Sequence, residues 1–159
     1  MASPAGVSAA VAASWSGILF DAACEVFSMM VGAALAPGAG KELSAGVVVT
    51  GTVGIAGAVR AILSLRCSTQ AATKIASHML GISAEEAAAQ NCDAIGEICN
   101  MVAGQFKTKL GLEAQCMLTV PTVITGSDYR VHSAAHGTRL DVPAVYDGEL
   151  IAIALDIPK

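Results

Sequence analysis

Charged side chains are scarce in this chain. Lys, Arg, Asp and Glu together make up 14% of the 159 residues, and the nine basic residues are outnumbered by thirteen acidic ones. Proteins that bind nucleic acid neutralise phosphates with a clustered basic surface. The formal net charge of −4 and the lack of a basic stripe therefore exclude nucleic acid as a partner.

Long uninterrupted apolar runs are also missing, although 54% of the residues are hydrophobic. Residues 43–59 carry no charge, but glycines divide them, so a β-hairpin explains them better than a membrane span. The apolar N-terminus has no positively charged start, and Asp21 and Glu25 interrupt it in helical register, unlike a signal peptide. We expect the front of an amphipathic helix there, and a cytoplasmic protein without a membrane partner.

Cysteine and histidine occur without the spacings that chemistry requires. The five cysteines are odd in number and show no CxxC pair, so we expect buried, reduced thiols. His78, His132 and His136 lack metal-ligand spacing, and no Ser/His/Asp or Cys/His arrangement can be argued. The sequence predicts no metal site and no cofactor of its own.

The remaining patterns predict one domain over residues 1–159 with an α+β fold. Helices are expected over 8–35 (with a possible break at 14–17), over 69–80 closed by Gly81, and from a capping box at Ser83 to Leu110. Strands are expected over 45–52, 56–64, 114–120, 123–125, 139–145 and 149–155, with Gly54 at the first bend and Asp147-Gly148 at the last. Residues 126–137 have the pattern of an irregular connection. This order favours helices on one face of a mostly antiparallel sheet.

The stretch from Asp93 to Leu110 carries the strongest functional signal. At about 100° per residue, Asp93, Glu97, Asn100 and Gly104 share an arc of about 60°, and apolar residues occupy the opposite side. A solvated face would carry longer, mixed Lys and Glu side chains. Two carboxylates, an amide and a bare glycine instead indicate a surface that presents itself to another molecule.

The same pattern occurs 72 residues earlier. Asp21, Glu25, Ser28, Met29 and Gly32 match Asp93, Glu97, Asn100, Met101 and Gly104. The segment 58–65 likewise resembles 149–156. Two copies of a helix and a hairpin predict an internal pseudo-twofold duplication, in which Ser28 has replaced the amide of the first copy.

These residues resemble the CheC/CheX/FliY phosphatases of bacterial chemotaxis, most closely CheX. The hallmark of that family is an Asp or Ser, three residues, Glu, two residues, Asn, and a Pro a little over twenty residues later. Here Asp93, Glu97 and Asn100 are followed at Pro121 by PTVITG. Two-site members carry two Glu/Asn pairs, whereas CheX-type members carry one on the second long helix, so Ser28 implies a single site.

The resemblance implies that the chain dephosphorylates a CheY-like receiver domain. A phosphoaspartate held with Mg²⁺ on the receiver needs only a water positioned in line, which suits the neutral amide of Asn100, while Glu97 could dock on the receiver's lysine. Asp93, Met101 and Gly104 are expected to contact the partner, and Pro121 to bend a strand without reaching the substrate. The alternative is a non-catalytic docking module that binds or sequesters a response regulator through the same face.

A homodimer is also expected. Few charges, many small apolar residues and a C-terminal hairpin favour assembly through strand edges. Residues 139–157 are the candidate edge, and the first hairpin is the alternative. Such a dimer would leave the face formed by residues 93, 97 and 100 open on each protomer.

Overall fold

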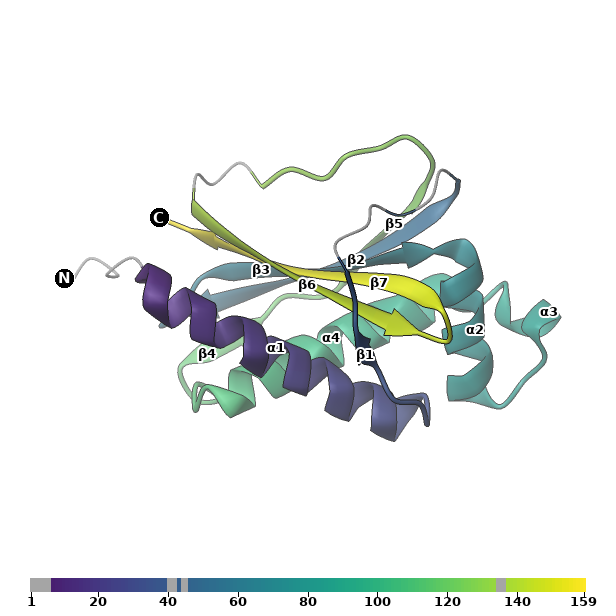
Figure 1. The fold of residues 1–159 in the computed structure, drawn as a ribbon, viewed down its shortest axis with the longest axis horizontal. Coiled ribbons are helices and arrows are strands. Elements are labelled where there is room, and N and C mark those ends of the chain that lie inside the picture. Colours follow the sequence, from purple (N-terminus) through teal and green to yellow (C-terminus); the bar gives the residue numbers. More distant parts are fainter. Residues whose placement is uncertain (1–6, 40–42, 44–45, 134–136) are drawn as a thin grey trace.

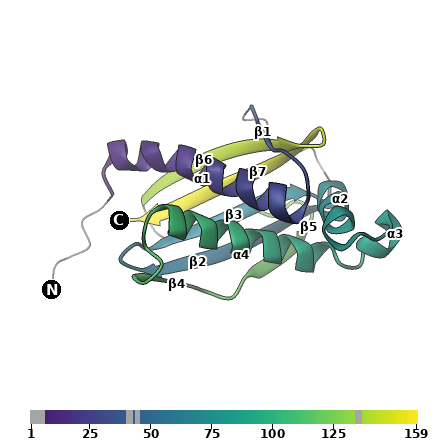
Figure 2. The ribbon, with the colours of Figure 1, turned by 90° about the horizontal axis from the view of Figure 1, so that it is seen from below.

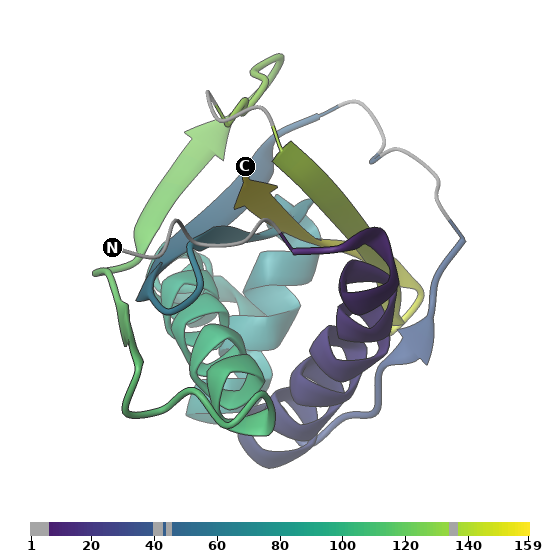
Figure 3. The same cartoon turned by 90° about the vertical axis from the view of Figure 1, so that its left-hand side faces the viewer.

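The computed structural model describes residues 7–39, 43, 46–133 and 137–159 as a seven-stranded antiparallel sheet with its helices on one face (Figures 1 and 3). The strands are ordered β1-β6-β7-β3-β2-β4, and β5 also pairs with β2. The elements are α1 (Ala9–Met30), β1 (Ala36–Pro37), β2 (Val48–Gly57), β3 (Ala61–Ser68), α2 (Thr69–Leu80), α3 (Ala84–Ala87), α4 (Asn91–Lys109), β4 (Cys116–Leu118), β5 (Thr122–Gly126), β6 (Gly137–Tyr146) and β7 (Glu149–Pro158). The predicted α+β fold is confirmed.

The predicted duplication is visible in the strand pairing. β3 and β7 lie together at the centre of the sheet, where Ser64 pairs with Ala154 and Arg66 with Ala152. The strand order is symmetric about this central pair, with β2 and β6 next to it and β4 and β1 beyond them, as a twofold axis requires. β3 begins at Ala61 and β7 at Glu149, which are 88 residues apart. The sequence match of 58–65 to 149–156 is therefore displaced by three residues, because the β2–β3 turn is longer than the β6–β7 turn.

The two halves are intertwined rather than side by side. The long helix α1 packs on β6 of the other half, and α4 packs on β2 (Figure 2). After each long helix, a short strand joins the other half's outer strand: β1 pairs with β6, and β4 and β5 pair with β2. Each half therefore completes the core of the other.

The helix α1 is part of that core. It is long and apolar enough to cross a membrane by length and composition alone, but it buries Trp15, Leu19 and Phe27 against the rest of the fold. Trp15 meets Phe106 of α4 edge-on, with ring centroids 5.9 Å apart. The helix runs unbroken through 14–17 and ends at Met30 rather than at residue 35, since Gly32 turns the backbone with a φ of +69°.

Two further boundaries differ from prediction. The first hairpin turns at residues 58–60, and Gly54 lies inside β2, where its N–H donates to Thr119 Oγ1 at 2.8 Å. The Ser83 cap, which accepts from Glu86 N at 3.2 Å, opens only the four-residue α3. A turn then lets Ala87 and Ala94 both pack on Ala76 of α2, so α4 begins at Asn91.

The strand bounds also shift, most of all in the first hairpin, where β2 spans 48–57 rather than 45–52 and β3 spans 61–68 rather than 56–64. The predicted helix over 69–80 and three predicted turns are confirmed. Helix α2 spans 69–80 and ends with Gly81 at a φ of +63°, and Gly111 follows α4 with a φ of +68°. Asp147 and Gly148 form the two-residue turn between β6 and β7, both with positive φ.

Only part of the segment that was expected to form an open edge lies at the edge of the sheet. β7 lies between β6 and β3, so only β6 of the proposed segment 139–157 can pair outward. β1 pairs with β6 only at Ala144 and Val145, and the described residues leave the first half of β6 without an outer neighbour.

The cysteines follow their predicted state only in part. Cys67, Cys99 and Cys116 are buried free thiols, whereas Cys24 and Cys92 are half-buried. Burial raises the pKa of Cys67 and Cys99 to about 12, which leaves these two thiols protonated and inert.

Candidate functional site

Helix α4 is seated tightly on the sheet. Ile95, Ile98 and Val102 are fully buried, and Gly51 of β2 lies directly beneath the helix. A Cβ at Gly51 would come within 3.2 Å of side-chain atoms of both Ile95 and Cys99. Because the apolar face of α4 is committed to the core in this way, the opposite face predicted from the sequence is presented outward.

A second close approach holds α4 against β5. A Cβ at Gly96 would lie 3.2 Å from Val123 Cγ2 and 3.7 Å from Pro121 Cβ. Beside this contact is a shallow hollow of about 340 Å³, lined by Cys92, Asp93, Gly96, Glu97, Pro121 and Val123. We call it the α4–β5 hollow.

Asp93 and Glu97 both line the α4–β5 hollow and are exposed, as predicted. Asn100 lies on the same stripe, three residues and therefore about 4.5 Å further along the helix axis, and is half-buried rather than open. None of these three side chains makes a hydrogen bond or ion pair with the described residues. The carboxylates and the amide are thus held by the helix backbone and available to another molecule.

Met101 and Gly104 are less exposed than their predicted role suggests. Met101 is half-buried and packs against the main core. Gly104 is half-buried next to β4, and a Cβ there would meet only Leu118 Cδ1, at an ordinary 3.9 Å. The glycine of α4 that allows a close approach within the fold is Gly96.

On α1, the residue that matches Glu97 is Glu25, and other side chains of the same molecule bind it. Glu25 forms an ion pair with Lys109 Nζ at 2.5 Å and accepts a short hydrogen bond from the Gln105 amide. The hydrogen bond from Lys109, with help from Gln105, lowers the pKa of Glu25. Ser28 is exposed at the position of the missing amide.

No group of three or more His, Cys, Asp or Glu side chains in the described ranges is arranged to hold a metal ion. His78 instead makes a short hydrogen bond with the Tyr146 hydroxyl. His132 lies on the other side of the sheet from α4, and His136 is outside the described residues.

Sequence reasoning missed Gly96, Pro121 and Val123 as parts of the site. Pro121 separates β4 from β5, as expected, but it also lines the α4–β5 hollow next to Glu97. One local signal was available. A glycine in a helix interior costs about 1 kcal/mol relative to alanine, so Gly96 marks a position where close approach outweighs helix propensity.

A protein-family model described as chemotaxis phosphatase CheX matches residues 49–145, which is more than half of the chain. The chain belongs to this family. The match includes α4, β5 and every residue that lines the α4–β5 hollow. Comparison with curated protein sequences gives no significant match.

Solved structures share the fold. CheX from Desulfovibrio desulfuricans is 23% identical with a TM-score of 0.74, covering 91% of this chain and 99% of that one. CheX in a CheX–CheY–BeF3–Mg²⁺ complex from Borrelia burgdorferi is 23% identical with a TM-score of 0.72, covering 91% and 98%. FliY from Thermotoga maritima is 16% identical with a TM-score of 0.67, covering 91% and 86%.

Proposed function

We propose that this chain hydrolyses the aspartyl phosphate of a CheY-like receiver domain, using a single site on α4. The observation that carries the proposal is the pairing difference between the two helix faces. Glu97 is exposed and makes no polar side-chain contact among the described residues, and Asn100 lies one turn away. Glu25, in contrast, forms an ion pair with Lys109. Membership of the CheX family supports a phosphatase reading of that face.

Asn100 is the proposed catalytic residue. An acyl phosphate on a receiver hydrolyses slowly by itself, so an accelerator mainly has to hold a water in line with the P–O bond. The carboxamide oxygen accepts a hydrogen bond from that water, and the group stays neutral beside an anionic phosphoryl group. Its half-buried position restricts its motion, as a positioning group requires.

Glu97 is the proposed docking residue. Its carboxylate would pair with the cationic lysine of the receiver's active site, and such a charge-assisted contact fixes register as well as adding affinity. Asp93 and Gly104 extend the same stripe on either side, and the half-buried Met101 adds an apolar contact beside it. The receiver would bring its own Mg²⁺ to the phosphoryl group.

A CheY-type partner is supported by the Borrelia burgdorferi structure, which contains CheX together with CheY. Because such receivers signal inside the cell, we place the protein in the cytoplasm. We further propose a homodimer that uses the unpaired first half of β6, since this edge lies away from the α4–β5 hollow and leaves both sites open.

The decisive experiment is the decay of a phosphorylated receiver with and without the full chain. A CheY-type receiver from the same genome is phosphorylated with a small phosphodonor, the donor is removed, and the remaining phosphoprotein is followed over time. Catalysis at substoichiometric amounts of the chain supports the proposal. Binding without faster decay would show the docking module instead, and neither binding nor faster decay would overturn both.

A further inference from the structure

The face of the sheet opposite the helices carries a second, unrelated hollow. The connection from β5 to β6 has to cross β2, β3 and β7, because β5 and β6 lie near opposite edges of the sheet (Figure 1). Residues 127–133 of that connection, here called the strap, run over this outer face. Between strap and sheet is a cavity of about 120 Å³, which adjoins a wider hollow of about 610 Å³.

The strap is fixed to the sheet through Tyr129. Its hydroxyl forms a hydrogen bond with Thr50 Oγ1 at 2.7 Å and donates to the Ile124 carbonyl at 3.1 Å. Thr50 is only 2% exposed although it points away from the helices. The tyrosine ring is therefore a fixed wall of the wider hollow.

Arg66 stacks on this wall. Its side chain leaves the outer face of β3, and the guanidinium carbon lies 5.0 Å from the centre of the Tyr129 ring. Arg66 Nε is buried, yet it has no hydrogen-bond partner among the described residues. No carboxylate of the described chain lies within ion-pair distance of Arg66. A buried donor without an acceptor is rare in folded proteins, because its lost hydration is not replaced.

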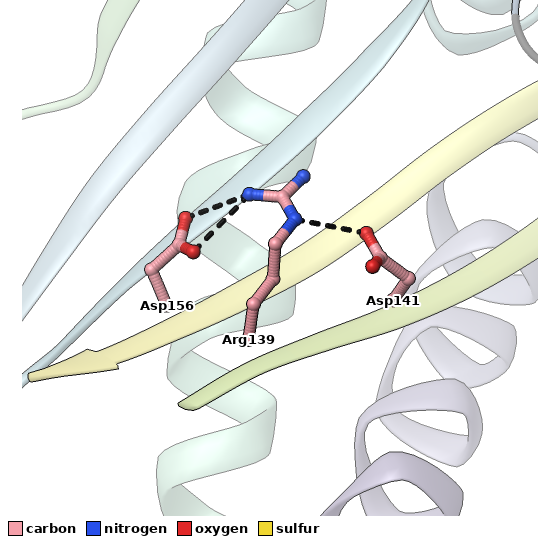
Figure 4. Close-up of polar contacts among 3 residues, drawn as sticks. All are labelled: Arg139, Asp141 and Asp156. Carbon is pink, nitrogen blue, oxygen red and sulfur yellow. Dashed lines mark hydrogen bonds and ion pairs between the residues drawn. The ribbon is translucent and has the colours of Figure 1, made fainter. Parts of the chain in front are cut away.

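The neighbouring arginine shows what Arg66 lacks. Arg139 donates from Nε to Asp141 at 3.0 Å and from Nη1 to Asp156 at 2.9 Å (Figure 4). Both aspartates line the same cavity and are satisfied by Arg139. The cavity thus contains one guanidinium held by two carboxylates, and a second, that of Arg66, with no carboxylate partner among the described residues.

We propose that this cavity binds a small anion, a carboxylate or a phosphoryl group, with Arg66 as its main ligand. A planar guanidinium offers two parallel donors to such a group, and stacking on Tyr129 orients it in advance. Ser64 and Thr52 add hydroxyl groups to the lining. The cavity volume of about 120 Å³ exceeds the roughly 10–15 Å³ that one water needs, so a polyatomic anion fits. The wider hollow receives the rest of the ligand.

The test is a titration of the ¹⁵N-labelled full chain, followed by NMR. Inorganic phosphate and propionate are added separately at constant ionic strength, with chloride as the balancing anion. We expect a saturable shift of the Arg66 Nε–Hε signal, identified by its loss in Arg66→Gln, with at least one of the two anions. Saturation by phosphate points to a phosphoryl ligand, and saturation by propionate to a carboxylate.

Variants distinguish a site from general charge attraction. The Tyr129 backbone amide is followed in each one. Arg66→Gln should weaken binding at least about tenfold, as expected for loss of a charge-assisted pair. Arg60→Gln makes the same change of charge in the exposed β2–β3 turn and should bind like the wild type. If Arg66→Gln does not fold, Arg66→Lys keeps the charge and should still weaken binding. Shifts that stay linear, or equal affinity in Arg66→Gln, would overturn the proposal.

Discussion

Glu25 and Glu97 occupy equivalent positions on the two long helices, but of the two only Glu25 has a polar partner in the described part of the chain. Its carboxylate pairs with Lys109 at 2.5 Å, across 84 residues of sequence, while Glu97 remains exposed at the α4–β5 hollow. Both residues that engage Glu25, Lys109 and Gln105, lie at the C-terminal end of α4. The helix that carries the proposed site therefore also supplies the side chains that bind Glu25 on α1.

The first prediction concerns the catalytic amide. Asn100→Ala should slow receiver dephosphorylation by about 10²-fold or more, the usual loss for one preorganised transition-state contact. Stability should change by no more than about 0.5 kcal/mol, since Asn100 has no side-chain partner among the described residues. Gln105→Ala removes an amide from the same helix and is the control. A variant at position 100 with near wild-type rates would show that the phosphatase proposal is wrong.

The second prediction concerns docking. Glu97→Ala should weaken receiver binding and lower the dephosphorylation rate, because it removes the exposed carboxylate of the proposed site. Glu25→Ala should change neither, since that carboxylate already faces Lys109. Calorimetric titration of the receiver and phosphoprotein decay give the two readouts. Equal losses at both positions would indicate two working faces.

The third prediction is a pH dependence of stability. The Lys109 hydrogen bond lowers the pKa of Glu25 below its ordinary 4.5, so the unfolded chain binds more protons there. The contribution of Glu25 is complete above that value and is lost as the pH falls through the lower folded-state pKa. The melting temperature of the wild type should exceed that of Glu25→Gln at about pH 7, and the gap should close as the pH falls below 4.5. A gap that does not change with pH would contradict an ionic origin.

The fourth prediction compares two glycines. Gly51→Ala places a Cβ 3.2 Å from both Ile95 and Cys99 in a buried contact, and overpacking of this kind costs about 1–3 kcal/mol. Gly104→Ala meets only Leu118 at 3.9 Å and gains helix propensity, up to about 1 kcal/mol. Urea denaturation measures both.

Gly104→Ala also tests the proposed interface. If Gly104 gives the receiver clearance, this variant should fold well and bind the receiver less tightly. Unchanged affinity would show that Gly104 does not contribute to the interface.

The fifth prediction concerns assembly. Size exclusion coupled to light scattering should give a mass near twice the 15.9 kDa of one chain at tens of micromolar protein. Asp141→Pro, within the unpaired half of β6, should reduce that mass, because position 141 lies two residues before Pro143, whose carbonyl faces outward to Gly38, and its backbone donor therefore points to the open edge. A wild-type mass near that of one chain would reject the dimer.

Local patterns in the sequence were sufficient for several features. The two faces of α4 follow from the spacing of Asp93, Glu97 and Asn100 against the apolar residues, because 3.6 residues per turn fixes which side chains share a side. Gly81 and the Asp147-Gly148 turn were likewise found at their predicted places, since each depends on backbone conformations that few residues adopt.

Other features depend on contacts between distant segments, and only the tertiary structure decided them. Pro121 lines the α4–β5 hollow because β4 and β5 pair with β2, which brings Val123 against Gly96. Glu25 is closed off by Lys109 because α1 and α4 pack together, and Arg66 is enclosed because the strap must cross the sheet to reach β6. Helix and turn signals act over a few residues, whereas these neighbours are set by how an intertwined duplication arranges its strands. The positions of Asp93, Glu97 and Asn100 on α4 could therefore be predicted from the sequence, whereas the residues that surround them could not.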